Sequence, residues 1–156
     1  MGLMGYVPPA RLLQGLTVRQ ARAFCAPSVG ASYAGRSVRS NRLDEGARCA
    51  VCGRPATNAH HEPPVGMGGG RARLALNGVA MRPALIALCG SGTTGCHGKV
   101  HSGALRLEWA FDSDEEEELW WRGWFAPEVY EAGAAGLGRW EVRDRAGNLL
   151  KTIRRD

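Results

Sequence analysis

Cysteines and histidines, the residues of this chain best suited to metal chemistry, gather within about one third of its length. Four of the five cysteines stand at positions 49, 52, 89 and 96, and all four histidines stand at positions 60, 61, 97 and 101. In a cytoplasmic protein, clustered cysteines and histidines indicate metal binding more than disulfide bonds. Cys25 lies outside this window, and we expect it to be a small buried hydrophobic residue.

The four clustered cysteines have the pattern of a structural zinc site. Two residues separate Cys49 from Cys52, as in a zinc knuckle, whereas six residues that include three glycines separate Cys89 from Cys96. Two distant cysteine pairs commonly supply four thiolates to one Zn²⁺, which leaves no open coordination position. The sequence therefore predicts a structural Zn²⁺. The alternative is a set of buried cysteines without a metal.

The four histidines are then available for a second centre. His60 and His61 are adjacent, so on a strand their side chains point to opposite faces. His97 and His101 are four residues apart, so on a helix they share one face. Three imidazoles can hold a divalent ion and leave positions open for a phosphate oxygen. The alternative is that His60 or His97 joins the zinc site and the other histidines have no metal role.

Three stretches carry these residues in a fixed order: CAVC, then NAHHEPPVGMGG, then LCGSGTTGCHGKVH. In this order they resemble the HNH, or ββα-metal, nuclease family, over about residues 48–103. The Gly-Thr-Thr-Gly-Cys-His-Gly segment together with the upstream cysteine pair resembles HNH proteins encoded by phages and prophages.

This resemblance implies an endonuclease that hydrolyses DNA phosphodiester bonds, as a nicking or packaging enzyme of a phage or mobile element. His61 would be the general base that takes a proton from the attacking water. His60, His97 and His101 would hold a catalytic divalent ion, for which Mg²⁺, Mn²⁺, Ni²⁺ and Zn²⁺ are the candidates. The expected products carry 5′-phosphate and 3′-hydroxyl ends.

One position departs from the family pattern. The family has an Asn five residues before the first cysteine of the second pair, and here that position is Ala84. Asn77 and Asn58 are the candidates to replace it in space. Two alternative functions follow: a zinc-ribbon DNA-binding module that has lost catalysis, and a zinc-stabilised protein-interaction adaptor that uses the acidic, Trp-rich C-terminal third.

The net charge of +5 is unevenly distributed. Residues 1–48 carry +5, residues 49–104 carry +4 and residues 105–156 carry −4. A polyanion such as DNA would be attracted to the first two segments. Arg71, Arg73 and Lys99 are the candidate phosphate contacts, with plain solvation as the alternative reading.

The elements that must position these residues form an α+β chain, with a ββα-metal core on a zinc knuckle. A short helix is expected over 18–24, capped by Thr17, within an N-terminal segment 1–47 whose residues 28–42 have the composition of a basic arm or a solvated tail. The core, 48–104, is expected to hold a strand over 56–61, a strand over 84–88 and a helix from 96 to 105.

The C-terminal segment, 105–156, is expected to form a helix and a hairpin. Ser113 begins a capping-box pattern ahead of a helix that contains Trp120 and Trp121. Residues 141–144 and 149–153 are expected to pair as the hairpin. We expect the tryptophans to pack in the core, with base stacking as the alternative.

Length and hydropathy favour one compact domain of 156 residues. No apolar run approaches the roughly 20 residues that cross a bilayer, and the N-terminus lacks the apolar stretch of a secretion signal. We therefore expect a cytoplasmic protein whose partner is DNA and not a membrane, with a possible packaging or other protein partner at the C-terminal region.

Overall fold

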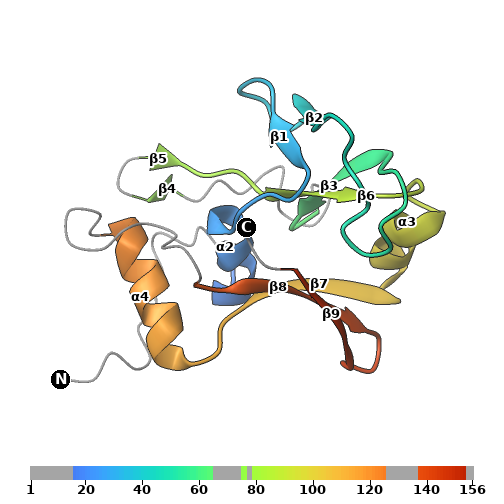
Figure 1. Ribbon diagram of the computed structural model, residues 1–156. Coiled ribbons are helices and arrows are strands. Elements are labelled where there is room, and N and C mark those ends of the chain that lie inside the picture. Colours follow the sequence, from blue (N-terminus) through green and yellow to red (C-terminus); the bar gives the residue numbers. More distant parts are fainter. Residues whose placement is uncertain (1–15, 65–74, 77–78, 126–136, 154–156) are drawn as a thin grey trace.

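The computed structural model describes residues 16–64, 75, 76, 79–125 and 137–153 of the chain (Figure 1). It is a mixed α+β structure of small antiparallel sheets and short helices, as the sequence predicts. The helices are α2 (Val18–Cys25), α3 (Gly95–Ser102) and α4 (Asp114–Phe125). The strands are β1 (Ala31–Tyr33), β2 (Asn41–Leu43), β3 (Asn58–Glu62), β4 (Ala75–Leu76), β5 (Val79–Ala80), β6 (Ala84–Leu88), β7 (Leu105–Ala110), β8 (Arg139–Asp144) and β9 (Leu149–Ile153).

Strands β3 and β6 pair antiparallel and are followed in the chain by α3, which contacts β6. All five residues of β6 are buried, because this strand lies between other elements on both faces. The register places His60 opposite Ile86 and His61 opposite Leu85. The strand expected over 84–88 is confirmed, and the expected helix is present but ends at Ser102, because Leu105 already belongs to β7.

Helix α2 begins where the sequence predicts. The Thr17 hydroxyl accepts a hydrogen bond from the Gln20 amide at 3.1 Å, and the Gln20 side chain accepts one from the Thr17 amide at 2.9 Å. This reciprocal pair satisfies two amides that a helix start otherwise leaves without partners. Ala21 and Phe24 are buried, and α2 lies between β6 and β7, contacting both (Figure 1).

Residues 28–43 differ from the arm or tail that their composition predicts. β1 and β2 form a two-stranded antiparallel sheet, and Val29 makes a parallel bridge to Ile86 of β6. The Tyr33 hydroxyl donates to the Pro83 carbonyl at 2.7 Å, which ties β1 to the start of β6. Strands this short are stable only against a partner, so local sequence patterns do not reveal them.

The C-terminal sheet has the strand order β7-β8-β9. The hairpin of β8 and β9 is the one expected from the sequence, whereas β7 is an additional strand. Its residues alternate between buried and half-buried, with Leu105, Leu107 and Trp109 on the buried face. This alternation is the mark of a strand with one face on the core.

Helix α4 begins after Ser113, whose hydroxyl accepts a hydrogen bond from the Glu116 amide at 3.1 Å. Glu116 does not complete the capping box, because its carboxylate instead accepts from the Gly138 amide at 2.9 Å. Trp120 and Trp121 are 1% and 0% exposed, which supports core packing of these rings rather than base stacking.

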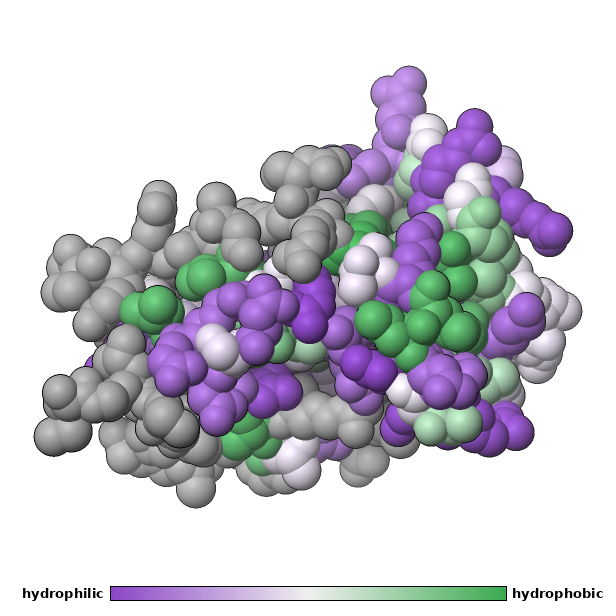
Figure 2. Space-filling model, turned by 60° about the horizontal axis from the view of Figure 1, so that its bottom comes forward, coloured by the Kyte–Doolittle hydropathy of each residue, from purple (hydrophilic) through white to green (hydrophobic). Residues whose placement is uncertain are grey.

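One hydrophobic core joins the three segments of the chain. Its buried residues come from α2, β6, α3, β7, α4 and β8, and Cys25 is among them, as expected. The face that carries the three-stranded sheet mixes hydrophilic and hydrophobic residues (Figure 2). Within the described ranges the large hydrophobic side chains that remain exposed are Leu149 and Leu150 of β9. No helix in the described part of the chain is long and apolar enough to span a membrane.

Candidate metal centres

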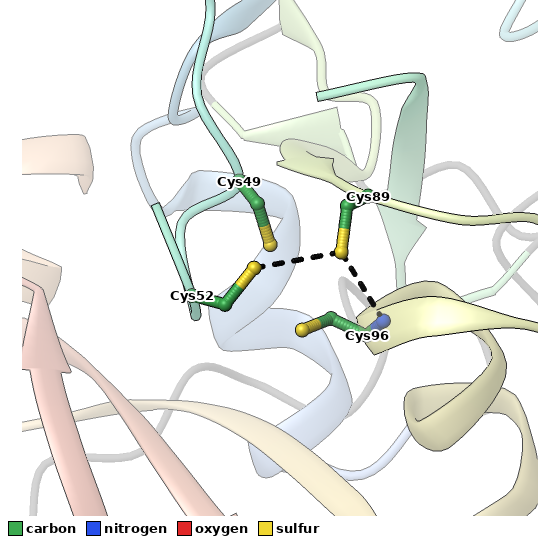
Figure 3. A group of neighbouring side chains, drawn as sticks. All are labelled: Cys49, Cys52, Cys89 and Cys96. Carbon is green, nitrogen blue, oxygen red and sulfur yellow. Dashed lines mark hydrogen bonds between the residues drawn. The ribbon is translucent and has the colours of Figure 1, made fainter. Parts of the chain in front are cut away.

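Four cysteines converge on one point between three elements. Cys49 and Cys52 lie in a turn that follows β2, Cys89 directly follows β6, and Cys96 lies in the first turn of α3. Their sulfur atoms point toward one another (Figure 3) and all lie within 4.8 Å of each other, with 3.6 Å between those of Cys52 and Cys89. Zn–S bonds of about 2.3 Å in a tetrahedron place sulfurs about 3.8 Å apart. All five cysteines are free thiols, so these four can hold a metal ion such as zinc.

The backbone around the first pair is a tight turn fixed to the core. The Gly53 amide donates to the Cys49 carbonyl at 2.9 Å, and the Cys49 amide donates to the Arg54 carbonyl at 2.6 Å. The Ala50 amide donates to the Ala87 carbonyl at 2.9 Å, which fastens the turn to β6. The first cysteine pair is therefore held at a set distance from Cys89, which directly follows the same strand.

The second pair is closed by the glycine-rich turn from Gly90 to Gly95. The Ser91 amide donates to the Thr94 carbonyl at 3.1 Å, and the His97 amide donates to the Cys89 carbonyl at 3.0 Å. The Gly90 carbonyl accepts from the Thr57 hydroxyl at 2.7 Å and from the Asn58 side chain. The long spacing of the second pair is thus accommodated without breaking the cysteine cluster.

The thiols of the cluster differ in acidity. Burial raises the pKa of Cys49, but hydrogen bonds from the backbone of Cys52, Cys89 and Val51 outweigh it, so the pKa falls to about 7. Burial and the neighbouring cysteines raise the pKa of Cys96. The Cys49 thiol therefore loses its proton more readily than the Cys96 thiol, since a thiolate at Cys49 repels a second negative charge at Cys96. A bound cation relieves that repulsion, which fits this donor set to a metal.

Three of the four histidines form a second cluster. His60 of β3 lies with His97 and His101 of α3, and one ring nitrogen of each lies within 4.8 Å of the others. The ring centroids are 4.5 Å apart for His97 and His101, and 5.4 Å apart for His60 and His97. His97 and His101, four residues apart on α3, thus lie close to His60 of β3. These are the three imidazoles that the sequence predicts as metal ligands.

The cluster has the properties of a cation site. Nδ1 of His97 is buried, and no described residue hydrogen-bonds to it. Burial, and to a smaller extent the positive charges that His60, His101 and His61 would carry, lower the pKa of His97 to about 4. The His97 imidazole is therefore neutral at pH 7 and keeps a lone pair for a metal. An unpartnered buried nitrogen that lies close to two further imidazoles fits a divalent ion.

A carboxylate that sequence reasoning missed adjoins this cluster. Glu62 lies two residues after His60 on the same face of β3, and its Oε1 is 3.0 Å from His60 Nε2. The His60 side chain is 1% exposed and that of Glu62 is 22% exposed. Glu62 also lines a cavity of about 570 Å³ with Glu108 and Trp109. Carboxylates in this position commonly orient metal-binding histidines.

His61 points to the opposite face of β3 from His60 and has its own partners. Its Nε2 lies 2.6 Å from the Val38 carbonyl oxygen and 3.4 Å from Nδ2 of Asn41. A carbonyl oxygen only accepts, so Nε2 carries the proton and donates to Val38, and Nδ1 keeps its lone pair. Burial lowers the pKa of His61; the Val38 bond opposes this, and the charges of His60 and Arg39 add to it. His61 is therefore a neutral base at pH 7.

The asparagines are not arranged as the sequence suggests. Ala84 is 2% exposed and lies opposite Glu62 in the β3–β6 register, so it offers no polar group to His61. Asn58 bonds to the Gly90 carbonyl rather than to His61, and Asn77 lies outside the described residues. The asparagine in contact with His61 is Asn41 of β2, which no motif in the sequence identifies.

Of the three candidate phosphate contacts, Lys99 is exposed on α3, on the side of the helix opposite to His97 and His101, and Arg71 and Arg73 lie outside the described residues. The structure adds two other basic residues. Arg39 is exposed and acts electrostatically on His61, and the Arg82 guanidinium stacks on Tyr33 at 3.8 Å from the ring centroid. Tyr33 in turn lies 6.3 Å from the His61 ring.

No family model, curated protein or solved structure matches the chain. The two donor clusters and the environment of His61 are therefore the observations from which a function can be inferred.

Proposed function

We propose that this protein is a metal-dependent endonuclease of the HNH type that hydrolyses DNA phosphodiester bonds. The observation that carries the proposal is that two adjacent histidines of β3 lie in different environments on opposite faces of the strand. His60 faces two helical histidines in a cation site, while the next residue, His61, is a neutral imidazole on the other face with one nitrogen fixed by a carbonyl. A metal-assisted hydrolase requires a metal site and a neutral base, and here adjacent residues of β3 contribute to the two.

The topology around these residues supports the same reading. Two antiparallel strands, β3 and β6, are followed by α3, and the histidines lie on the first strand and on the helix. This order is the one that the ββα-metal resemblance requires. The four cysteines lie where β6 ends and α3 begins, so a structural Zn²⁺ there would hold the helix at a set distance from the strands.

In the proposed mechanism, His60, His97 and His101 would hold the catalytic divalent ion. When bound, that ion supplies Lewis-acid stabilisation of the charge that develops on the phosphate and on the leaving oxygen. Nδ1 of His61 accepts a proton from water as the water oxygen bonds to phosphorus. The bond between phosphorus and the 3′-oxygen breaks, and that oxygen gains a proton from solvent. The products carry a 5′-phosphate and a 3′-hydroxyl.

Charge near His61 favours a polyanionic substrate. Arg36, Arg39 and Arg42 are exposed, and none forms an ion pair with a described residue. Arg39 acts electrostatically on His61, and Arg82 stacks on Tyr33, whose ring lies 6.3 Å from that of His61, so positive charge lies near His61. Phosphates of a nucleic-acid strand would offset that charge.

A plasmid-nicking assay with Mg²⁺, Mn²⁺, Ni²⁺ or Zn²⁺ added to the zinc-loaded chain tests the proposal. We expect cleavage with at least one ion, and His61→Ala should lower the rate by roughly 10²- to 10⁴-fold, as for removal of a general base. Leu150→Ala, a change on the exposed edge strand β9, is the matched control and should cleave normally. Full activity of His61→Ala would overturn the general-base assignment.

Two other outcomes identify the alternatives. DNA retardation that weakens steeply with salt, without cleavage by any metal, would identify a DNA-binding module, for which Ala84 is the motivating residue. If the protein neither retards nor cleaves DNA, the remaining alternative is an interaction adaptor that uses the C-terminal region.

A further inference from the structure

The carbonyl oxygen of Val38 lies within hydrogen-bonding distance of two side chains. His61 Nε2 lies 2.6 Å from it and Asn41 Nδ2 lies 3.1 Å from it, while the two nitrogens are 3.4 Å apart. A carbonyl oxygen has two lone pairs, so it can accept from both donors. The two nitrogens are then close because both donate to the same oxygen, and no hydrogen bond forms between them.

The segment that carries this carbonyl is anchored at both ends but is not part of a strand. Asn41 begins β2 and pairs with Tyr33 of β1, which is tied to Pro83 at the start of β6. Between the strands, the Ala34 amide donates to the Ser40 carbonyl at 2.6 Å, and Val38 is 8% exposed. No strand ladder sets the direction of the Val38 carbonyl, so apart from His61 itself the Asn41 side chain is the group that donates to it and can orient it.

We propose that Asn41 is a positioning residue for His61. By donating to the Val38 carbonyl, it holds that oxygen where His61 must donate through Nε2, which leaves Nδ1 as the nitrogen that can take a proton. Asn41 thereby supplies from β2 a polar anchor that Ala84 of β6 cannot supply. The catalytic consequence rests on the proposed function, whereas the hydrogen-bond geometry does not.

Asn41 is separate from both metal centres. His60 and His61 point to opposite faces of β3, and Asn41 makes its hydrogen bonds on the His61 side, to Val38. Removing the Asn41 amide should therefore change the state of the His61 ring without changing metal affinity. This separates a positioning role from general damage to the fold.

The test uses the full-length, zinc-loaded chain with ¹⁵N-labelled histidine. The imidazole Nε2–H proton of His61 is observed by NMR and its exchange rate with water is measured, together with kcat and KM for plasmid nicking. Asn41→Ala removes the amide, and Asn41→Leu removes it while keeping the side-chain volume, so at least one folded variant is available. Asn148→Ala, which removes an amide in the β8–β9 turn, is the matched control.

We expect a protected Nε2–H proton in the wild-type and Asn148→Ala proteins, and exchange faster by about tenfold or more in the Asn41 variants. kcat should fall roughly two- to tenfold with KM and metal affinity unchanged, because one hydrogen bond is lost. Unchanged exchange in a folded Asn41 variant would overturn the proposal. If no protein cleaves DNA but exchange depends on Asn41, the proposed function fails and the positioning of His61 stands.

Discussion

The glycine-rich turn between Cys89 and Cys96 gives the sharpest prediction about how the cysteine cluster is built. Gly90 has a φ of +86°, and a Cβ added there would lie 2.1 Å from the Thr94 carbonyl oxygen and 2.7 Å from the Cα of Gly95. Gly53, beside the first cysteine pair, has a similar φ of +80°, but an added Cβ would meet nothing within 4 Å. Both Gly90→Ala and Gly53→Ala should therefore lose stability through the backbone conformation, and Gly90→Ala should lose more through a steric collision.

The shared cost is the left-handed backbone conformation, which destabilises a non-glycine residue by roughly 1–2 kcal/mol. The second cost applies to Gly90 alone, since its Cβ would collide with backbone atoms that cannot rotate away. Overpacking of this kind costs roughly 1–3 kcal/mol. We therefore expect Gly90→Ala to be less stable than Gly53→Ala by about 1–3 kcal/mol, or about 5- to 150-fold in the folding equilibrium.

Denaturation of the zinc-loaded chains by guanidinium, followed by fluorescence of the buried tryptophans, measures this difference. Cobalt substitution measures in parallel whether four thiolates still bind one ion, because opening the turn moves Cys96 away from Cys89. Equal denaturation midpoints for the two variants, with equal cobalt binding, would refute the argument that the turn is closed by backbone contact at Gly90.

Three further predictions concern the histidine cluster and its surroundings. Glu62→Gln should weaken divalent-metal binding at that cluster by roughly 10- to 100-fold in calorimetry, with Glu108→Gln as the control from the same cavity; equal affinities would exclude an orienting role. The folded-state pKa of His97, about 4, is below its unfolded value of about 6.5, so protons favour the unfolded chain. The metal-free protein should lose stability as pH falls from 6.5 toward 4, and urea midpoints should fall less steeply in His97→Gln; identical pH profiles would contradict this. Arg39→Ala should weaken DNA binding and reduce its salt slope by about one, whereas Arg145→Ala, which removes the guanidinium that donates to the Ser102 carbonyl, should not; an unchanged slope would remove Arg39 from the interface.

Local signals in the sequence were sufficient for several elements. The uniformly apolar run 84–88 is β6, the Thr17 cap begins α2, and the turn before Leu149 joins β8 to β9. The alternation of Leu105, Leu107 and Trp109 is also a local signal, but the strand β7 was not predicted from it, because the helix that carries the histidines was expected to extend to residue 105. In each case, the residues that define the element are neighbours in the chain.

The donor clusters were predictable for a related reason. Metal ligands must be of a few residue types, and their spacing is constrained by the turn, strand or helix that carries them. The spacing therefore identifies two pairs, Cys49 with Cys52 on a tight turn and His97 with His101 on one helical face. The sequence alone determined which residues gather, and the structure places the two cysteine pairs within 4.8 Å of one another.

Only the tertiary structure decided what surrounds these residues. Asn41 and the Val38 carbonyl reach His61 from 20 and 23 residues away, and residues 28–43 pack on β6 although their composition is that of a solvated arm. Short strands and single hydrogen bonds gain their stability from partners distant in the chain, so no local pattern encodes them. The sequence identifies the cysteines and histidines that could hold a metal, whereas the tautomer and orientation of His61 depend on the folded chain.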